Sequence, residues 1–77
     1  MQKVHLIRRA AGHAAAGAEI LNQMVAIQTF EDQSILHVDT ATEEIAALLQ
    51  QYKSEMGRVS ELLYQYLEFR KNGHLRP

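Results

Sequence analysis

Large apolar residues recur at alternating steps of four and three residues between Thr40 and Lys71, and this spacing constrains the fold more than any other feature of the chain. Steps of this kind place every member on one face of a helix, with the period of about 3.5 residues that is typical of a coiled coil. The members of this stripe are Ile45, Leu49, Tyr52, Met56, Val59, Leu63 and Tyr66. Further apolar residues widen it at Leu48, Leu62, Leu67 and Phe69. We therefore predict a long helix that contacts other helices on more than one side.

Both ends of this helix carry residues that favour helix termini. Thr40 followed by Glu43 matches the pattern of a capping box, which would satisfy free backbone N–H groups at the start. Arg70 suits the C-terminal turn, because cations there interact favourably with the helix dipole. Gly73 can adopt the left-handed conformation that closes many helices.

A second helix is predicted from about residue 3 to residue 28, where the same alternation recurs. Its stripe consists of Ile7, Ala11, Ala14, Ala18, Leu21 and Val25. The first half of this stripe is small, which allows another helix to approach closely. Gly12 and Gly17 each cost about 1 kcal/mol against alanine within a helix. Their presence indicates close contact, or a helix that needs its partner to form fully.

The chain is predicted to be a single all-α domain, an antiparallel helical hairpin over residues 1–77. It would consist of a helix at about 3–28, a loop at 29–39, a helix at about 40–71 and a mobile tail at 72–77. Two helices alone leave an apolar face in water, so we expect two hairpins to pair into a four-helix bundle. The residues expected at the interfaces are Ile45, Leu49, Tyr52, Met56, Val59, Leu63, Tyr66, Leu21 and Val25.

Length, composition and charge argue against several classes of protein. A chain of 77 residues buries a small core, and without cysteine it has no disulfide or thiolate metal site to brace it, so association is the expected brace. The formal net charge of −1 gives no global attraction to nucleic acid. No apolar run reaches the length of about 20 residues that a membrane span needs. The alanine-rich stretch Ala10–Ala18 lacks the large residues of a secretory signal, so we expect a cytoplasmic protein with no cleaved signal peptide.

No residue pattern points to catalysis. The four histidines do not form a pair at i and i+4, and no acidic residue completes a metal-binding spacing. No serine or threonine sits in a nucleophile motif, and no glycine-rich loop could hold a phosphate. We therefore expect no enzyme, no catalytic residue, no metal site and no cofactor. The histidines, which are expected in solvent or in loops, are His5, His13, His37 and His74.

Charge is segregated along the chain in a way that the net value hides. Six of the eight cations lie near the termini, at Lys3, Arg8, Arg9, Arg70, Lys71 and Arg76. Five of the nine acids lie near the predicted loop, at Glu31, Asp32, Asp39, Glu43 and Glu44. A hairpin would therefore have a basic pole and an acidic pole. Two interpretations stay open: head-to-tail pairing or an anionic partner at the basic pole, and simple agreement with helix-dipole preferences.

Tyr64 lies off the apolar stripe, and Glu68 follows one helical turn later on an outward face. A short helical hairpin with such a Tyr-x-x-x-acid pair resembles the small WXG-type proteins of type VII (ESX) secretion and the helical partner proteins encoded beside LXG toxins. The resemblance implies an antiparallel four-helix bundle of two hairpins, with Tyr64 and Glu68 as a motif read by the export machinery. The chain has no tryptophan, and so no Trp-x-Gly, which points to a divergent or partner-type relative.

The expected function is a non-enzymatic helical protein–protein interaction module. By the resemblance it would be a type VII secretion effector or the partner of one, exported without a cleaved signal peptide. The alternative is a small dimeric cytoplasmic regulator of phage or bacterial type, which binds another protein or, with less support, nucleic acid. The expected partner is a second copy in a homodimer, or another helical protein.

Overall fold

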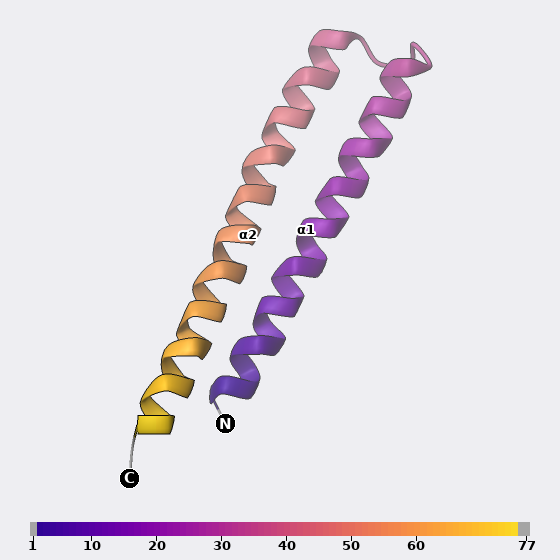
Figure 1. The fold of residues 1–77 in the computed structure, drawn as a ribbon. Helices are drawn as coiled ribbons and strands as arrows, with labels where there is room; N and C mark the ends of the chain where they lie inside the picture. The colour runs from indigo at the N-terminus through magenta and orange to yellow at the C-terminus, as the bar shows by residue number, and fades with distance from the viewer. Residues whose placement is uncertain (1, 76–77) are drawn as a thin grey trace.

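Two long helices lie side by side and run in opposite directions (Figure 1). The computed structural model describes the backbone of residues 2–75 and the side chains of residues 5–72. Helix α1 spans Gln2–Asp32 and helix α2 spans Val38–Leu75. The start of α1 and the end of α2 lie at the same end of the hairpin (Figure 1). The predicted all-α helical hairpin is therefore confirmed.

The helix bounds differ from the predicted ones at the connection and at the C-terminal end. Residues 33–37 alone join the helices, because α1 continues to Asp32 and α2 already begins at Val38. The predicted loop at 29–39 is therefore too long. Residues 72–75 of the predicted mobile tail belong to α2, which continues through Gly73 instead of closing there. Residues 76 and 77 lie outside the described part of the chain, as do the side chains of Lys3 and His74.

A Schellman motif closes α1, with a serine in the position where glycine is usual. The Ile35 N–H donates to the carbonyl of Phe30 at 2.8 Å, and the Ser34 N–H donates to the carbonyl of Glu31 at 2.9 Å. Ser34 has φ 62°, in the left-handed region that residues with a Cβ rarely adopt. The capping bonds outweigh this cost, and they turn the chain without a glycine.

His37 provides the N-terminal cap of α2. Its Nδ1 accepts a hydrogen bond from the Asp39 N–H at 3.2 Å, and its carbonyl accepts the Ala41 N–H at 3.0 Å. The side chain thus satisfies one of the backbone donors that a helix start leaves free. Thr40 already lies inside the helix, so the predicted capping box at this residue is wrong.

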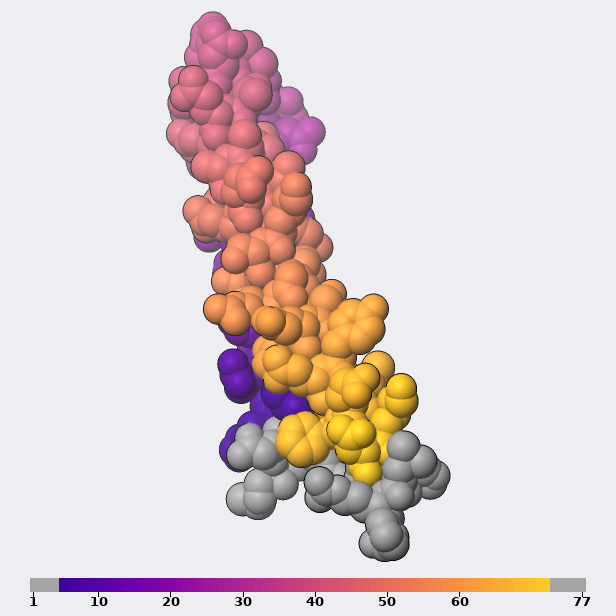
Figure 2. All heavy atoms as spheres, turned by 90° about the vertical axis from the view of Figure 1, so that its left-hand side faces the viewer, coloured from indigo at the N-terminus to yellow at the C-terminus, as the bar shows by residue number. Residues whose placement is uncertain are grey.

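The hairpin is a thin rod rather than a compact body (Figure 2). It measures 64 × 15 × 12 Å, and its radius of gyration is 17.9 Å, compared with about 11–12 Å for a compact domain of this length. Its accessible surface is 5980 Å², whereas a monomer of this mass normally exposes about 4,700 Å². The chain alone therefore leaves an unusually large surface in water.

Candidate protein-binding face

The contact between the helices follows a heptad pattern on both of them. We call this set of facing residues the hairpin seam. On α1 it consists of Leu6, Ala10, His13, Gly17, Ile20, Met24 and Ile27, all of them buried or half-buried. On α2 it consists of Ala41, Ile45, Leu48, Tyr52, Glu55, Val59, Leu62 and Tyr66, which are also buried or half-buried. Both sets advance by alternating steps of four and three residues, as in an antiparallel coiled coil.

The most closely packed part of the seam lies near the chain termini. Leu6, Ala10 and Leu62 form a buried cluster there, with Val59 and Tyr66 packed against it. Arg70 extends over this end, because its Nη1 donates to the Tyr66 hydroxyl at 3.2 Å and its guanidinium lies 5.9 Å from the centre of the Tyr66 ring. The described end of the hairpin is thus held by apolar packing and a cation–π contact.

A polar pair interrupts the seam near its middle. His13 Nδ1 lies 2.5 Å from Glu55 Oε1, and each side chain is about one-third exposed, at 33% and 30%. The contact is a hydrogen bond with either charge state of the ring, and an ion pair when the imidazole is protonated. The prediction for His13, a solvated or loop histidine, is therefore wrong. The sequence did contain a signal for this position: His13 lies three residues after Ala10 and four before Gly17, so it continues the heptad spacing of the seam.

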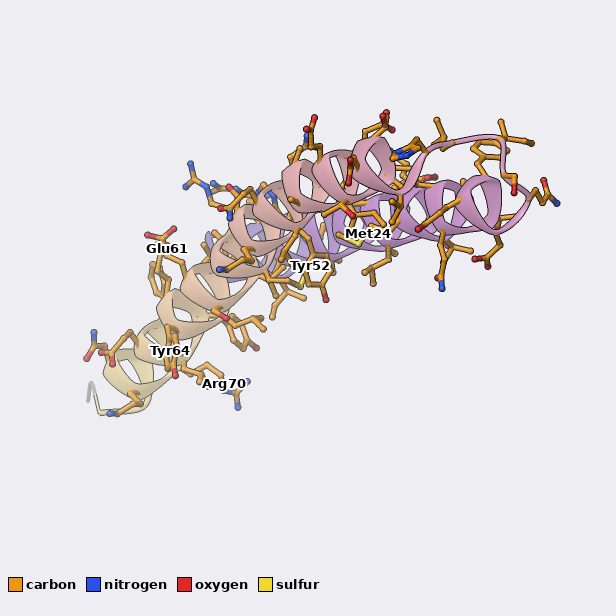
Figure 3. The ribbon with its side chains drawn as sticks, turned by 90° about the horizontal axis from the view of Figure 1, so that it is seen from above. Met24, Tyr52, Glu61, Tyr64 and Arg70 are labelled. Atoms are coloured by element: carbon orange, nitrogen blue, oxygen red, sulfur yellow. The ribbon has the colours of Figure 1, made fainter. Side chains whose placement is uncertain are left out.

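Gly17 lies in the seam at a point where side chains of α2 pack directly against the backbone of α1. A Cβ built on this residue would come 2.5 Å from Met56 Cε and 3.4 Å from Tyr52 Cε1. The predicted close contact therefore exists at Gly17. Gly12 faces open space, since a Cβ there would meet nothing within 4 Å. Tyr52 and Met24 project from the two helices in the part of the hairpin nearer the connection (Figure 3).

The predicted stripe of α1 does not face α2, because the seam lies one residue earlier along the chain. Leu21 and Val25, predicted at an interface, are exposed, and Val25 keeps 60% of its surface in water. The other exposed members of that stripe are Ile7, Ala11, Ala14 and Ala18.

The predicted stripe of α2 divides between two surfaces. Ile45, Tyr52, Val59 and Tyr66 lie in the hairpin seam, half-buried against α1. Leu49 and Leu63 lie outside it and are exposed, and Met56 is half-buried between the two surfaces. The buried leucines of α2 are Leu48 and Leu62, each one residue before an exposed leucine.

These exposed residues of the two helices lie on the same side of the hairpin. In right-handed helices that run in opposite directions, the residue that follows a seam residue by one position points to the same side in both. Ala14 and Met56 each follow one member of the His13–Glu55 pair, so they lie level with each other. The apolar face, as we call it, consists of Ile7, Ala14 and Leu21 of α1 and Leu49, Met56 and Leu63 of α2, flanked by Ala11, Ala18, Val25 and Leu67. By the same rule Lys53 and Ser60, which follow Tyr52 and Val59, lie at its outer edge on α2.

The opposite side of the hairpin is mainly polar. By the same geometry, residues that precede a seam residue by one position point there, and we call this side the polar face. It presents Arg9, Gln23, Gln51, Arg58 and Gln65, all of them exposed. Arg58 also contacts Glu61, with 3.5 Å between Nη1 and Oε1. One side of the hairpin therefore exposes mainly apolar side chains, and the opposite side exposes mainly polar and charged ones.

Tyr64 and Glu68 are both exposed, as predicted. Tyr64 keeps 71% of its surface in water and stands on the C-terminal half of α2, as does Glu61 (Figure 3). Neither Tyr64 nor Glu68 belongs to the hairpin seam or to the apolar face.

Among the side chains that the structure describes, no three His, Asp or Glu residues gather as ligands for a metal ion. Within the same part of the chain, neither helix has a stretch long and apolar enough to cross a membrane. A comparison with protein-family models, curated proteins and solved structures finds no match to this chain. The apolar face is therefore the feature of this molecule that bears on its function.

Proposed function

We propose that the chain is a non-enzymatic protein–protein interaction module that binds a helical partner through the apolar face. The observation that carries this proposal is the presence of apolar side chains, most of them large, on one side of both helices at heptad spacing, while the other side is mainly polar. Single exposed apolar residues are ordinary on protein surfaces, but a contiguous patch with this order marks an interaction site.

The spacing also indicates what kind of partner fits. Ile7, Ala14 and Leu21 advance by seven residues on α1, and so do Leu49, Met56 and Leu63 on α2. Rows with this period accept the side chains of another helix as knobs in holes. A flat sheet or a small molecule would not match two parallel rows of this length.

Site-specific photo-crosslinking in the cells that express the protein would test the proposal. We expect a photoreactive phenylalanine at Leu49 to crosslink to a helical protein, identified by mass spectrometry as a second copy or another chain. The same group at Gln51 is the matched control, because it lies two residues away on the polar face. The crosslink from Leu49 should disappear with Leu21→Glu, which places a charge beside it. Equal crosslinking from both positions, or none from either, would contradict the proposal.

A secretion role is a second candidate, favoured by the exposure of Tyr64 one turn before Glu68. In this case the chain would be an effector of type VII secretion or the partner of one. Tyr64→Ala should then abolish export or partner recognition while it changes the free energy of unfolding by less than about 0.5 kcal/mol, as is usual for surface substitutions. Gln65→Ala is the matched control. A folded Tyr64→Ala variant that is still exported would exclude this role.

The other alternative is a small dimeric cytoplasmic regulator that binds another protein or, with less support, nucleic acid. It would use the same apolar face, so the identity of the protein crosslinked at Leu49 separates it from the secretion role.

A further inference from the structure

We infer that the occupant of the apolar face is a second copy of this chain, packed face to face and antiparallel, with a two-fold axis at the level of Ala14 and Met56. This inference deepens the proposed function and depends on it. The axis would lie in the interface, perpendicular to the helices, so that α1 packs against α1 of the other copy and α2 against α2. The product is a four-helix bundle in which all neighbouring helices run antiparallel.

The pattern of side-chain sizes on the face is self-complementary about this axis. Ala14 and Met56 occupy the central level, with Ile7 and Leu63 on one side and Leu21 and Leu49 on the other. Each of these levels lies seven residues, about 10 Å, from the centre. The two-fold operation therefore places Ile7 against Leu21 of the other copy, and Leu63 against Leu49. Large side chains therefore meet large side chains at both outer levels. A two-fold interface needs such a match, because the same surface of each copy must fit against itself.

The axis also coincides with the middle of the rod. From Ala14 to the end of α1 at Asp32 is about 27 Å, and from Met56 to the end of α2 at Leu75 is about 28 Å in the opposite direction. Two copies related by this axis overlap along nearly their whole length. The surface in excess of an ordinary monomer, about 1,200 Å² by the mass scaling, is more than the roughly 800 Å² that each partner buries in a standard stable interface.

The charges of the two poles decide between antiparallel and parallel pairing. Arg70 lies about 21 Å from the axis along α2, and Glu43 and Glu44 lie about 18–20 Å from it on the other side. The two-fold operation therefore brings Arg70 and Lys71 of each copy level with Glu43 and Glu44 of the other. Glu44 precedes the seam residue Ile45 and points toward the polar face, so the poles attract each other through the field of their charges rather than through direct ion pairs. A parallel pair would place basic pole against basic pole and acidic pole against acidic pole, at an electrostatic cost.

Distances between spin labels would measure the predicted arrangement directly. Asn22 and Thr29 are exposed positions on the outer side of α1, and the native chain has no cysteine to interfere with labelling. In the antiparallel dimer, a residue and its copy separate along the rod by about 3 Å for each residue from Ala14, twice the helical rise. The axial separation should be about 24 Å for labels at Asn22 and about 45 Å for labels at Thr29. Equal distances at the two positions would show a parallel dimer and overturn the inference.

A charge exchange tests the contact between the poles. Arg70→Glu with Lys71→Glu, and separately Glu43→Lys with Glu44→Lys, should each weaken self-association at least tenfold in sedimentation equilibrium. An equimolar mixture of the two variants should restore the affinity of the native chain, because the poles that lie level with each other in the mixed dimer again carry opposite charges. The helicity of each variant, read by circular dichroism, controls for folding. A mixture that associates no better than its components would overturn the predicted register.

The outcomes separate this inference from the proposed function. A purified chain that sediments as a folded monomer at 100 μM, while Leu49 still crosslinks to another protein in cells, overturns the dimer and retains the interaction module. A folded monomer that also fails to crosslink from Leu49 overturns both.

Discussion

Helix α1 carries two apolar stripes that are offset by one residue, and only one of them is buried. The buried stripe includes Leu6, Ile20 and Met24, and the exposed stripe includes Ile7, Leu21 and Val25. Both follow the same alternation of four and three residues. The exposed stripe is in fact the more uniformly apolar one, because His13 and Gly17 interrupt the buried one. Hydrophobic content therefore does not decide which stripe of α1 meets α2.

The choice depends on shape and on polar pairing across the seam. Gly17 gives the Tyr52 ring room to lie close to the backbone of α1, at 3.4 Å from a Cβ built there. His13 faces Glu55, so the polar residue that interrupts one helix meets a partner on the other. Ala14 and Ala18 of the exposed stripe have no polar atoms with which to satisfy Glu55, which would then lie half-buried without a partner. The other stripe of α1 remains in contact with solvent.

Replacing each of two neighbouring leucines by alanine should show the largest difference between the buried stripe and the exposed stripe. Leu62 is 3% exposed in the terminal cluster, and Leu63 is 38% exposed on the apolar face. Leu62→Ala should lower the free energy of unfolding of the hairpin by about 2–5 kcal/mol, enough to unfold a small domain. Leu63→Ala should lower the stability of the hairpin itself much less, and should weaken self-association instead. Thermal melts at low and high protein concentration separate the two effects, and an equal loss for both variants at low concentration would contradict the assignment.

The polar pair of the seam offers a smaller test. His13→Ala should cost about 1 kcal/mol, because Glu55 loses its partner while it remains partly shielded from water, and solvent screening reduces the loss. The double change His13→Leu with Glu55→Leu should recover this loss or exceed it, since the seam then becomes as apolar as the face. Urea unfolding of the native chain, the two single variants and the double variant would measure the coupling. A coupling energy of zero would show that the pair does not select the buried stripe.

The two glycines of the N-terminal half of α1 provide the smallest test. Gly12→Ala should raise the free energy of unfolding by up to about 1 kcal/mol, because it gains helix propensity and meets nothing within 4 Å. Gly17→Ala should gain less, because the new Cβ displaces Met56 Cε from the seam. Thermal melts of both variants would check this order. A larger gain at Gly17 would mean that Met56 moves without loss and that the close contact there is unimportant.

The sequence was sufficient for the helical hairpin and for most of the candidate face, but not for the register of α1. Val59 and Tyr66 were correctly predicted as contact residues, because apolar residues at helical spacing identify the face of a long amphipathic helix that packs against another helix. Leu21 and Val25, predicted at an interface, lie outside the hairpin seam, and the sequence did not show which stripe of α1 meets α2, since a heptad pattern is unchanged by a shift to a neighbouring apolar stripe.

The ends of the helices were predicted less well, for a local reason. Ser34 adopts the left-handed conformation usually reserved for glycine, and His37 caps a helix although serine, threonine, aspartate and asparagine are the usual caps. Both positions depart from residue preferences, so the sequence pattern ended the first helix near residue 28 and began the second at Thr40. Hydrogen bonds to the backbone decided both ends, and these are visible only in the structure.

The short connection at residues 33–37 has a consequence for the order in which the hairpin folds. Contacts beside the connection join residues that are close in sequence, whereas Leu6 and Leu62 are separated by more than fifty residues. Closing the longer loop first would cost about 2 kcal/mol more in chain entropy. Folding should therefore begin at the connection and proceed toward the termini, so that the Leu6–Leu62 cluster forms after the rate-limiting step.

Interactions made after the transition state slow unfolding without speeding folding. We therefore expect substitutions in the terminal cluster to change mainly the rate of unfolding, and substitutions in the turn around Ser34 to change mainly the rate of folding. We therefore expect a chain built in this way to open first at the end where α1 begins and α2 ends, where Arg70 lies over Tyr66.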